Sequence, residues 1–155
     1  MKNIFLCTQH NEPWVLEAQK QYQKKINYFI NFDICSAKSK GISREHKELK
    51  KEEDSKSILK NIKPGGKIIL FDERGKLCLS SNEFAKELIS VWESSPDKIY
   101  FIVGGAYGVN EKIKKTADKT LSLSYQSFNH HIAQIMAMEQ IYRSLNIWKN
   151  LPYHN

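Results

Sequence analysis

The sequence has few of the residues that stabilise secreted or metal-bound small proteins. It has 155 residues but only three cysteines, Cys7, Cys35 and Cys78, which are far apart and form no Cys-x-x-Cys pair. An odd, scattered set of this kind argues against a disulfide framework and against a zinc ribbon. None of the five histidines has metal-ligand spacing such as His-Glu-x-x-His. We therefore expect free thiols in or near a core, and no bound metal.

Long apolar runs are also missing. No stretch approaches the length of a membrane span. Residues 1–7 are too short for the apolar region of a signal peptide, and no small-residue cleavage site follows them. We expect a cytoplasmic protein without membrane contact. Hydrophobic residues make up 41% of the chain, which is enough for a real core, and the length suits one domain over residues 1–155.

Acidic residues are outnumbered by basic ones. The chain has 24 Lys and Arg against 17 Asp and Glu, a net charge of +7. This balance favours a polyanionic partner, because cations that neutralise phosphates release counterions. A lysine-rich composition can equally be background, and no arginine-rich tail or RGG tract is present.

Apolar strand patterns alternate with helical patterns along the whole chain. Strands are expected at residues 4–7, 32–35, 67–71, 98–103 and 121–124, and helices at 12–30, within 41–62, at 81–93, 110–118 and 129–148. Ser80 or Ser81 is placed to cap the third helix, with Glu83 completing a capping box. Residues 72–76 should form a tight loop. The alternation predicts an α/β fold, a mostly parallel sheet flanked by helices.

Three strand ends carry unusual residues: 72–76, 104–108 and 123–128. Ligands of open α/β sheets bind outside the carboxyl ends of the strands. Glycines at 104, 105 and 108 let the backbone approach a ligand and expose its N–H and C=O groups, which suits an adenosine or amino-acid moiety. The pattern is neither a Rossmann fingerprint nor a P-loop. A plain glycine turn and an ordinary polar loop remain the alternatives.

Five segments of the chain, taken together, carry a characteristic set of residues. They are Tyr100 to Gly108, Leu121 to Ser124, Phe128 to His130, Met138 to Arg143 and Tyr153-His154. In this order and spacing they resemble the signature of one SPOUT family, the 23S rRNA pseudouridine N3-methyltransferases, also called methyltransferase H. The resemblance covers the chain from end to end in length, but its specific motifs lie in the last third.

This resemblance implies a SPOUT fold with a deep C-terminal trefoil knot and a homodimer whose active site uses both subunits. It implies S-adenosylmethionine as cofactor and, as substrate, N3 of a pseudouridine in the helix 69 loop of 23S rRNA on the assembled ribosome. The cofactor contacts that it implies are Phe71, Gly104, Gly105, Leu123, Ser124, Tyr125, Gln126, Ser127 and Phe128.

Methylation of an imide nitrogen requires alignment with the methyl carbon and removal of a proton. Tyr153 and His154 are the candidates for substrate positioning or proton handling, and Arg143 for contact with RNA or with developing negative charge. Without the resemblance, the first two would be an ordinary tail and Arg143 a solvated charge. The last helix also offers more apolar positions than one core face needs, which favours a dimer. These positions are Ile132, Ile135, Met136, Ile141 and Leu145.

The chain departs from the family at three places. Asn129 replaces the usual Pro, Gln134 replaces the usual Arg, and residues 7–10 replace a Gly-Lys turn. Loss of an arginine weakens phosphate or carboxylate contacts. Two other functions therefore stay open: a methyltransferase of the same fold that acts on tRNA, and a catalytically decayed ribosome-binding protein.

Overall fold

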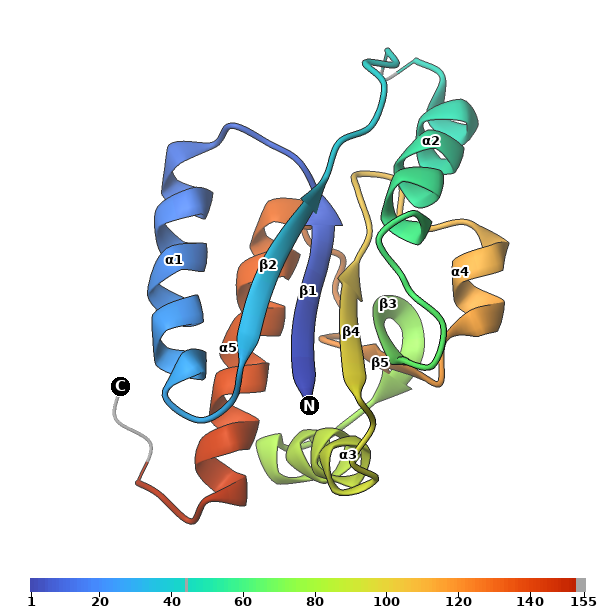
Figure 1. Ribbon diagram of the computed structural model, residues 1–155. Coiled ribbons are helices and arrows are strands. Elements are labelled where there is room, and N and C mark those ends of the chain that lie inside the picture. The colour runs from blue at the N-terminus through green and yellow to red at the C-terminus, as the bar shows by residue number, and fades with distance from the viewer. Residues whose placement is uncertain (44, 153–155) are drawn as a thin grey trace.

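The chain forms one parallel five-stranded sheet with helices on both faces (Figure 1). The structure, a computed structural model, describes residues 1–43 and 45–152. The strand order is β2-β1-β4-β3-β5, and every pairing is parallel. In chain order the elements are β1 (Lys2–Thr8), α1 (Pro13–Asn27), β2 (Phe32–Ala37), α2 (Lys47–Leu59), β3 (Lys67–Leu77), α3 (Ser81–Glu93), β4 (Lys98–Val103), α4 (Glu111–Thr116), β5 (Lys119–Ser122) and α5 (His130–Trp148). The predicted α/β class and parallel sheet are confirmed.

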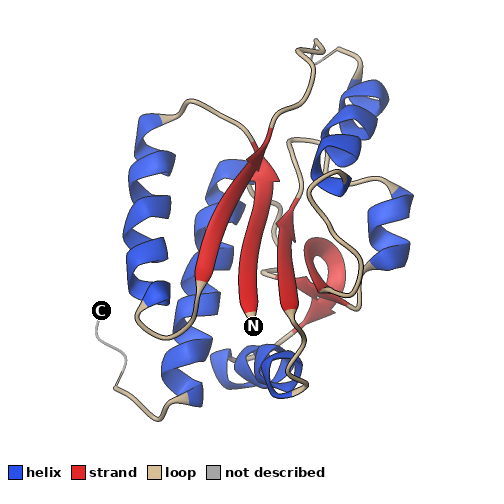
Figure 2. Ribbon diagram, viewed as in Figure 1, coloured by secondary structure: helices blue, strands red, loops and turns tan. Residues whose placement is uncertain are grey.

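Helices cover both faces of the sheet (Figure 2), and an apolar layer lies between the sheet and the helices on each face. Successive strand residues point to opposite faces, so neighbours such as Phe101 and Ile102 in β4 belong to different layers. The first layer packs against α1, α3 and α5, and the second against α2 and α4. Cys7 is buried in the first layer, where burial raises its thiol pKa to about 11. All three cysteines are free thiols, as expected.

Caps fix several helix starts. Ser80 Oγ accepts a hydrogen bond from the Glu83 backbone N–H (3.2 Å), so the predicted Ser80 cap is confirmed. The capping box is only partly right, because Glu83 Oε2 accepts its hydrogen bond from N–H of Leu79, the residue before the cap (2.9 Å). Asn129 caps α5, because its Oδ1 accepts a hydrogen bond from His131 N–H at 2.8 Å. An asparagine therefore serves at the position where the family usually has proline.

The predicted loop after the third strand is only partly right. β3 runs to Leu77, and both Phe71 and Lys76 pair with Leu121 of β5, so residues 72–75 bulge out before pairing resumes. A β-carbon at Gly75 would lie 2.7 Å from the Leu121 backbone, so this return requires glycine. β5 also ends at Ser122 and not at Ser124, because Ser122 Oγ donates a hydrogen bond to the Ser124 carbonyl and turns the chain.

Candidate active site

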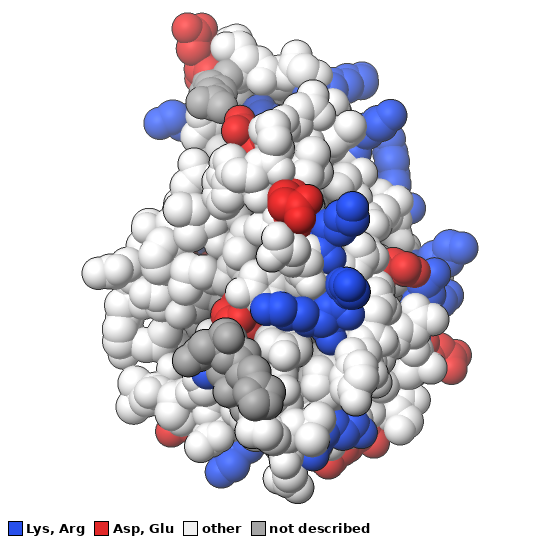
Figure 3. All heavy atoms as spheres, turned by 90° about the vertical axis from the view of Figure 1, so that its left-hand side faces the viewer, with Lys and Arg blue, Asp and Glu red and all other residues white. Residues whose placement is uncertain are grey.

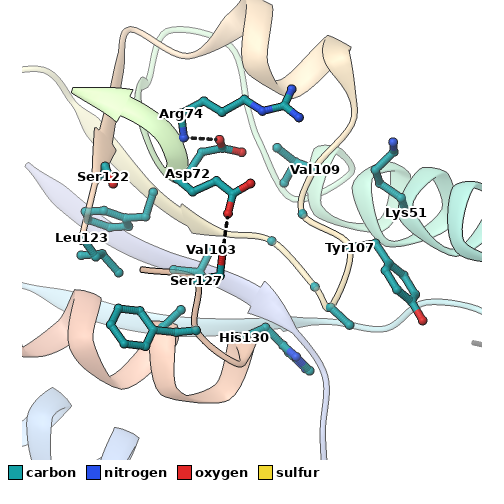
Figure 4. A pocket seen from close by; sticks show the side chains of 18 of the residues that line it. Lys51, Asp72, Arg74, Val103, Tyr107, Val109, Ser122, Leu123, Ser127 and His130 are labelled. Carbon is teal, nitrogen blue, oxygen red and sulfur yellow. Dashed lines mark hydrogen bonds between the residues drawn. The ribbon is translucent and has the colours of Figure 1, made fainter. Parts of the chain in front are cut away.

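A pocket of about 530 Å³ lies at the bulge of β3 and the carboxyl ends of β4 and β5 (Figure 4). This volume falls in the range typical of small-molecule and cofactor sites. Three segments line it: residues 71–74 at the bulge within β3, residues 103–109 at the end of β4, and residues 122–128 without Tyr125 at the end of β5. The other lining residues are His130, Ala133, Lys51, Glu111 and Lys114. The three strand ends that the sequence singles out thus meet in one place.

The pocket brings together eight of the nine residues proposed for the cofactor. Phe71, Gly104, Gly105, Leu123, Ser124, Gln126, Ser127 and Phe128 line it. Tyr125 does not, and its side chain is 89% exposed. The Phe71 ring forms an apolar wall and stacks between Phe84 and Phe101, with ring centroids 6.2 and 6.3 Å away.

The glycine loop is shaped by its own packing. Gly108 has φ +74° and donates its N–H to the Gly105 carbonyl at 3.0 Å. A β-carbon at Gly104 would lie 2.7 Å from the Gly108 carbonyl carbon, and one at Gly105 would lie 2.5 Å from Asp54 Oδ2. Both glycines are therefore needed for contacts inside the protein, in addition to any close approach by a ligand.

Helix α2 holds the glycine loop at both ends. The buried carboxylate of Asp54 lies against Gly105 and pairs with Lys50 Nζ at 3.0 Å. Ser55 Oγ accepts a hydrogen bond from the Asn110 backbone N–H at 2.9 Å, and Glu52 Oε2 accepts one from Asn110 Nδ2 at 3.0 Å. The sequence pattern of α2 indicates only a solvated charged face, so it gave no signal for this role.

The β3 bulge supplies the acidic side of the pocket. Glu73 Oε2 accepts a hydrogen bond from Ser127 Oγ at 2.9 Å, and Asp72 Oδ1 accepts one from Arg74 N–H at 3.0 Å (Figure 4). The first bond ties the bulge to the loop after β5. The second bond lies within the bulge and holds its own conformation.

Three histidines gather at the start of α5. The ring of His130 lies 4.0 Å from that of His131, centroid to centroid, and His131 lies 4.7 Å from His10. Both ring nitrogens of His10 are buried without a hydrogen bond of normal geometry. Burial lowers the pKa of His10 and the nearby His131 lowers it further, while the Gln134 amide and Glu12 oppose the shift.

Two of the departures from the family pattern meet beside this cluster. Gln134 is fully buried, and its Oε1 accepts a hydrogen bond from Gln19 Nε2 at 2.8 Å. The same Gln19 nitrogen lies 3.8 Å from Cys7 Sγ. A neutral amide network therefore stands where the family usually places an arginine.

Of the three proposed catalytic residues, the structure describes only Arg143, which does not line this pocket. Tyr153 and His154 lie outside the described residues. Arg143 binds Glu139 Oε1 through Nη2 (2.9 Å) and Nε (3.2 Å). It is thirteen positions after His130 on α5, about 20 Å along the helix at 1.5 Å per residue.

Fewer apolar side chains of α5 remain outside the core than the sequence predicts. Ile141 and Leu145 are fully buried in the core. Ile132 is 44% exposed, and Ile135 and Met136 are half-buried. Within the described ranges, no helix has the length and apolarity to cross a membrane, and no cluster of three His, Cys, Asp or Glu could hold a metal.

Known proteins resemble this chain over nearly all of its length. A family profile described as "Predicted SPOUT methyltransferase" matches residues 1–154. A protein of Bdellovibrio bacteriovorus named "Ribosomal RNA large subunit methyltransferase H" is 47% identical over 93% of this chain and 92% of its own length. One of the same name from Dictyoglomus thermophilum is 43% identical over 99% and 98%. A solved "probable methylase family protein" from Haemophilus influenzae shares the fold with a TM-score of 0.56 at 14% identity, covering 99% of this chain and 70% of that one.

Proposed function

Because the chain belongs to the SPOUT methyltransferase family, we propose that it transfers a methyl group from S-adenosylmethionine to large-subunit ribosomal RNA. The observation that carries this proposal is the pocket at the bulge of β3 and the ends of β4 and β5, in a chain that matches relatives named for that activity from end to end. The side chains and backbone groups that line this pocket also fit the methyl donor.

The lining offers each part of the donor a suitable surface. Phe71, Leu123 and Phe128 provide apolar contact for an adenine ring, and the backbone of residues 104–108 offers N–H and C=O groups. The carboxylates of Asp72 and Glu73 suit the ammonium group of the methionine portion. When bound, the donor would supply a methyl group on a sulfonium, and this chain would align it with the acceptor.

We propose N3 of a pseudouridine in the helix 69 loop of 23S rRNA, on the assembled ribosome, as the acceptor. The net charge of +7 suits a polyanion. Figure 3 views the molecule from the α1 side and shows lysine and arginine side chains gathered near the centre of that face. Helix α1 contributes the exposed Lys20, Lys24 and Lys25.

The proposed assembly is a cytoplasmic homodimer of single knotted domains over residues 1–155. Apolar side chains exposed at the start of α1 and α5, such as Trp14 (52%), Leu16 (46%) and Ile132 (44%), suit a partner surface. A dimer also gives Arg143 a role, because it lies too far along α5 to reach its own pocket. In that arrangement Arg143, Tyr153 and His154 would serve the pocket of the partner subunit.

Mass spectrometry of 23S rRNA fragments from strains with and without the gene tests this function. We expect one methyl group on one pseudouridine to vanish in the deletion strain. If the rRNA is unchanged and a tRNA methyl group disappears instead, the proposed acceptor is wrong. Calorimetry with S-adenosylmethionine addresses the remaining alternative, since a decayed ribosome-binding protein would give no heat of binding.

A further inference from the structure

His130 is a titratable side chain placed at the opening of the proposed donor pocket. It is the first residue of α5 and lines the pocket together with Phe128 and Ala133. Figure 4 shows it across the pocket from Asp72 and Arg74. An acceptor base that enters beside the donor would therefore come close to this imidazole.

His130 stands at the positive end of a helix dipole and beside a second imidazole. It lies at the N-terminus of a helix of 19 residues, where the helix dipole disfavours a positive charge. Its ring lies 4.0 Å from that of His131, centroid to centroid and tilted by 49°, and His131 in turn contacts His10. A protonated imidazole disfavours protonation of a neighbouring one, and the pKa of His10 is lowered first by burial and then by His131.

Charged groups of both signs line the pocket together with His130. The cations are Lys51, Arg74 and Lys114, and the acids are Asp72, Glu73 and Glu111. Lys51 pairs with Glu48 at 2.6 Å and Lys114 with Glu111 at 2.9 Å. Beyond the row of histidines, Glu12 acts on His10 from the β1–α1 loop. Two of the three cations are thus paired with carboxylates, so the pocket presents charges of both signs to His130.

A neutral imidazole suits the proton that must leave the acceptor better than the acids of this pocket do. Lysine and arginine cations have no lone pair to accept it. Asp72 and Glu73 already accept hydrogen bonds from Arg74 N–H and Ser127, and a carboxylate is a weaker base than an imidazole.

We propose that His130 is the catalytic base of the methyl transfer. The inference rests on the proposed function. The N3–H bond of the acceptor breaks and its proton passes to a nitrogen of His130. The new N3–methyl bond forms as the carbon–sulfur bond of the donor breaks, and its electron pair stays on sulfur. The charge balances, since a sulfonium becomes a thioether while an imidazole becomes an imidazolium, which then loses its proton to water. His131 and His10 act through His130 as positioning residues.

The test compares His130→Gln with His46→Gln, the same change at an exposed histidine that precedes α2. Single-turnover transfer of a labelled methyl group to undermethylated ribosomes is measured over a range of pH. Calorimetry measures the affinity for S-adenosylhomocysteine, and NMR follows the imidazole signals. We expect His130→Gln to lower the rate about 10²–10⁴-fold, while His46→Gln leaves it unchanged. Melting temperature and S-adenosylhomocysteine affinity should stay near wild type in both.

The pH profile separates a base from a structural residue. The wild-type rate should rise with pH and level off above the pKa that NMR assigns to His130. The rate of His130→Gln should instead keep rising, about tenfold per pH unit, because only free imide anion then reacts. An unchanged rate or profile in His130→Gln, or a parallel loss of S-adenosylhomocysteine binding, overturns the inference. If wild-type protein transfers no methyl group to ribosomes, the proposed function fails and the inference falls with it.

Discussion

Gly105 lies directly against the buried carboxylate of Asp54, so that a β-carbon at Gly105 would lie 2.5 Å from Asp54 Oδ2. The carboxylate cannot easily move away, because it is only 2% exposed as a residue and pairs with Lys50. The contact couples a helix on one face of the sheet to the loop that lines the pocket.

Gly105→Ala should displace the glycine loop, because the new β-carbon would clash with the Asp54 carboxylate of α2. Overpacking of a well-filled site costs about 1–3 kcal/mol, so we expect a lower urea midpoint and weaker S-adenosylmethionine binding. Asp54→Ala removes the clashing oxygen, so the double variant should bind more tightly than Gly105→Ala alone. Gly41→Ala is the control, since a β-carbon there meets nothing within 4 Å. Strict additivity of the two changes in a double-mutant cycle would contradict the contact.

Ser55→Ala tests the other end of the same loop. The substitution leaves the Asn110 backbone N–H without its acceptor in a buried position, which costs about 1–3 kcal/mol of folding stability. Urea unfolding measures this loss. Ser90→Ala serves as the control, because Ser90 Oγ only donates to the Glu87 carbonyl on an exposed surface. Equal effects of the two substitutions would show that Ser55 does not hold the loop.

The element order and the position of the pocket could be predicted from the sequence because both depend on local patterns. Strand β4 was predicted with its observed bounds, Lys98–Val103, since its apolar run is continuous. The role of Asp54 could not be predicted. Its contact with Gly105 joins positions far apart in the chain, and the charges around it have the spacing of a solvated helix face.

The second part of β3, where pairing with β5 resumes after the bulge, was missed for a related reason. Lys76 pairs with Leu121 only because Gly75 lets two backbones come together. A run of Asp, Glu, Arg, Gly and Lys has the composition of a turn, and nothing local shows that pairing resumes after it. The histidine row is a similar case, since His10 and His131 meet only in the folded chain.

Glu87 should make folding stability depend on pH in the acid range. It accepts hydrogen bonds from both Lys76 and Lys119, which link α3 to β3 and β5. Hydrogen bonds from Lys119 and Lys76 lower the pKa of Glu87 in the folded state. The stabilisation is therefore present above the pKa of an unfolded-state glutamate and is lost as pH falls through the lower, folded-state pKa.

Glu87→Gln tests this dependence. At neutral pH we expect a loss of about 1 kcal/mol or less, because water screens the pairs. The difference from wild type should shrink as the solution is acidified, when urea unfolding is repeated at several pH values. Glu93→Gln, at the end of the same helix, is the control and should not show this convergence. A constant difference between Glu87→Gln and wild type at all pH values would exclude the ion pairs as its cause.

Arg143 should act on the pocket of the partner subunit. It lies about 20 Å along α5 from His130, yet the proposed function gives it a part in the reaction. Arg143→Ala and Gly105→Ala should each be nearly inactive as pure dimers. When the two are unfolded together and refolded at equal amounts, about half of the dimers are mixed, and each mixed dimer has one pocket with intact loop and intact partner arginine. We therefore expect about a quarter of wild-type methyl transfer. If the refolded mixture is no more active than the average of the two pure variants, Arg143 either acts on the pocket of its own subunit or has no part in the reaction.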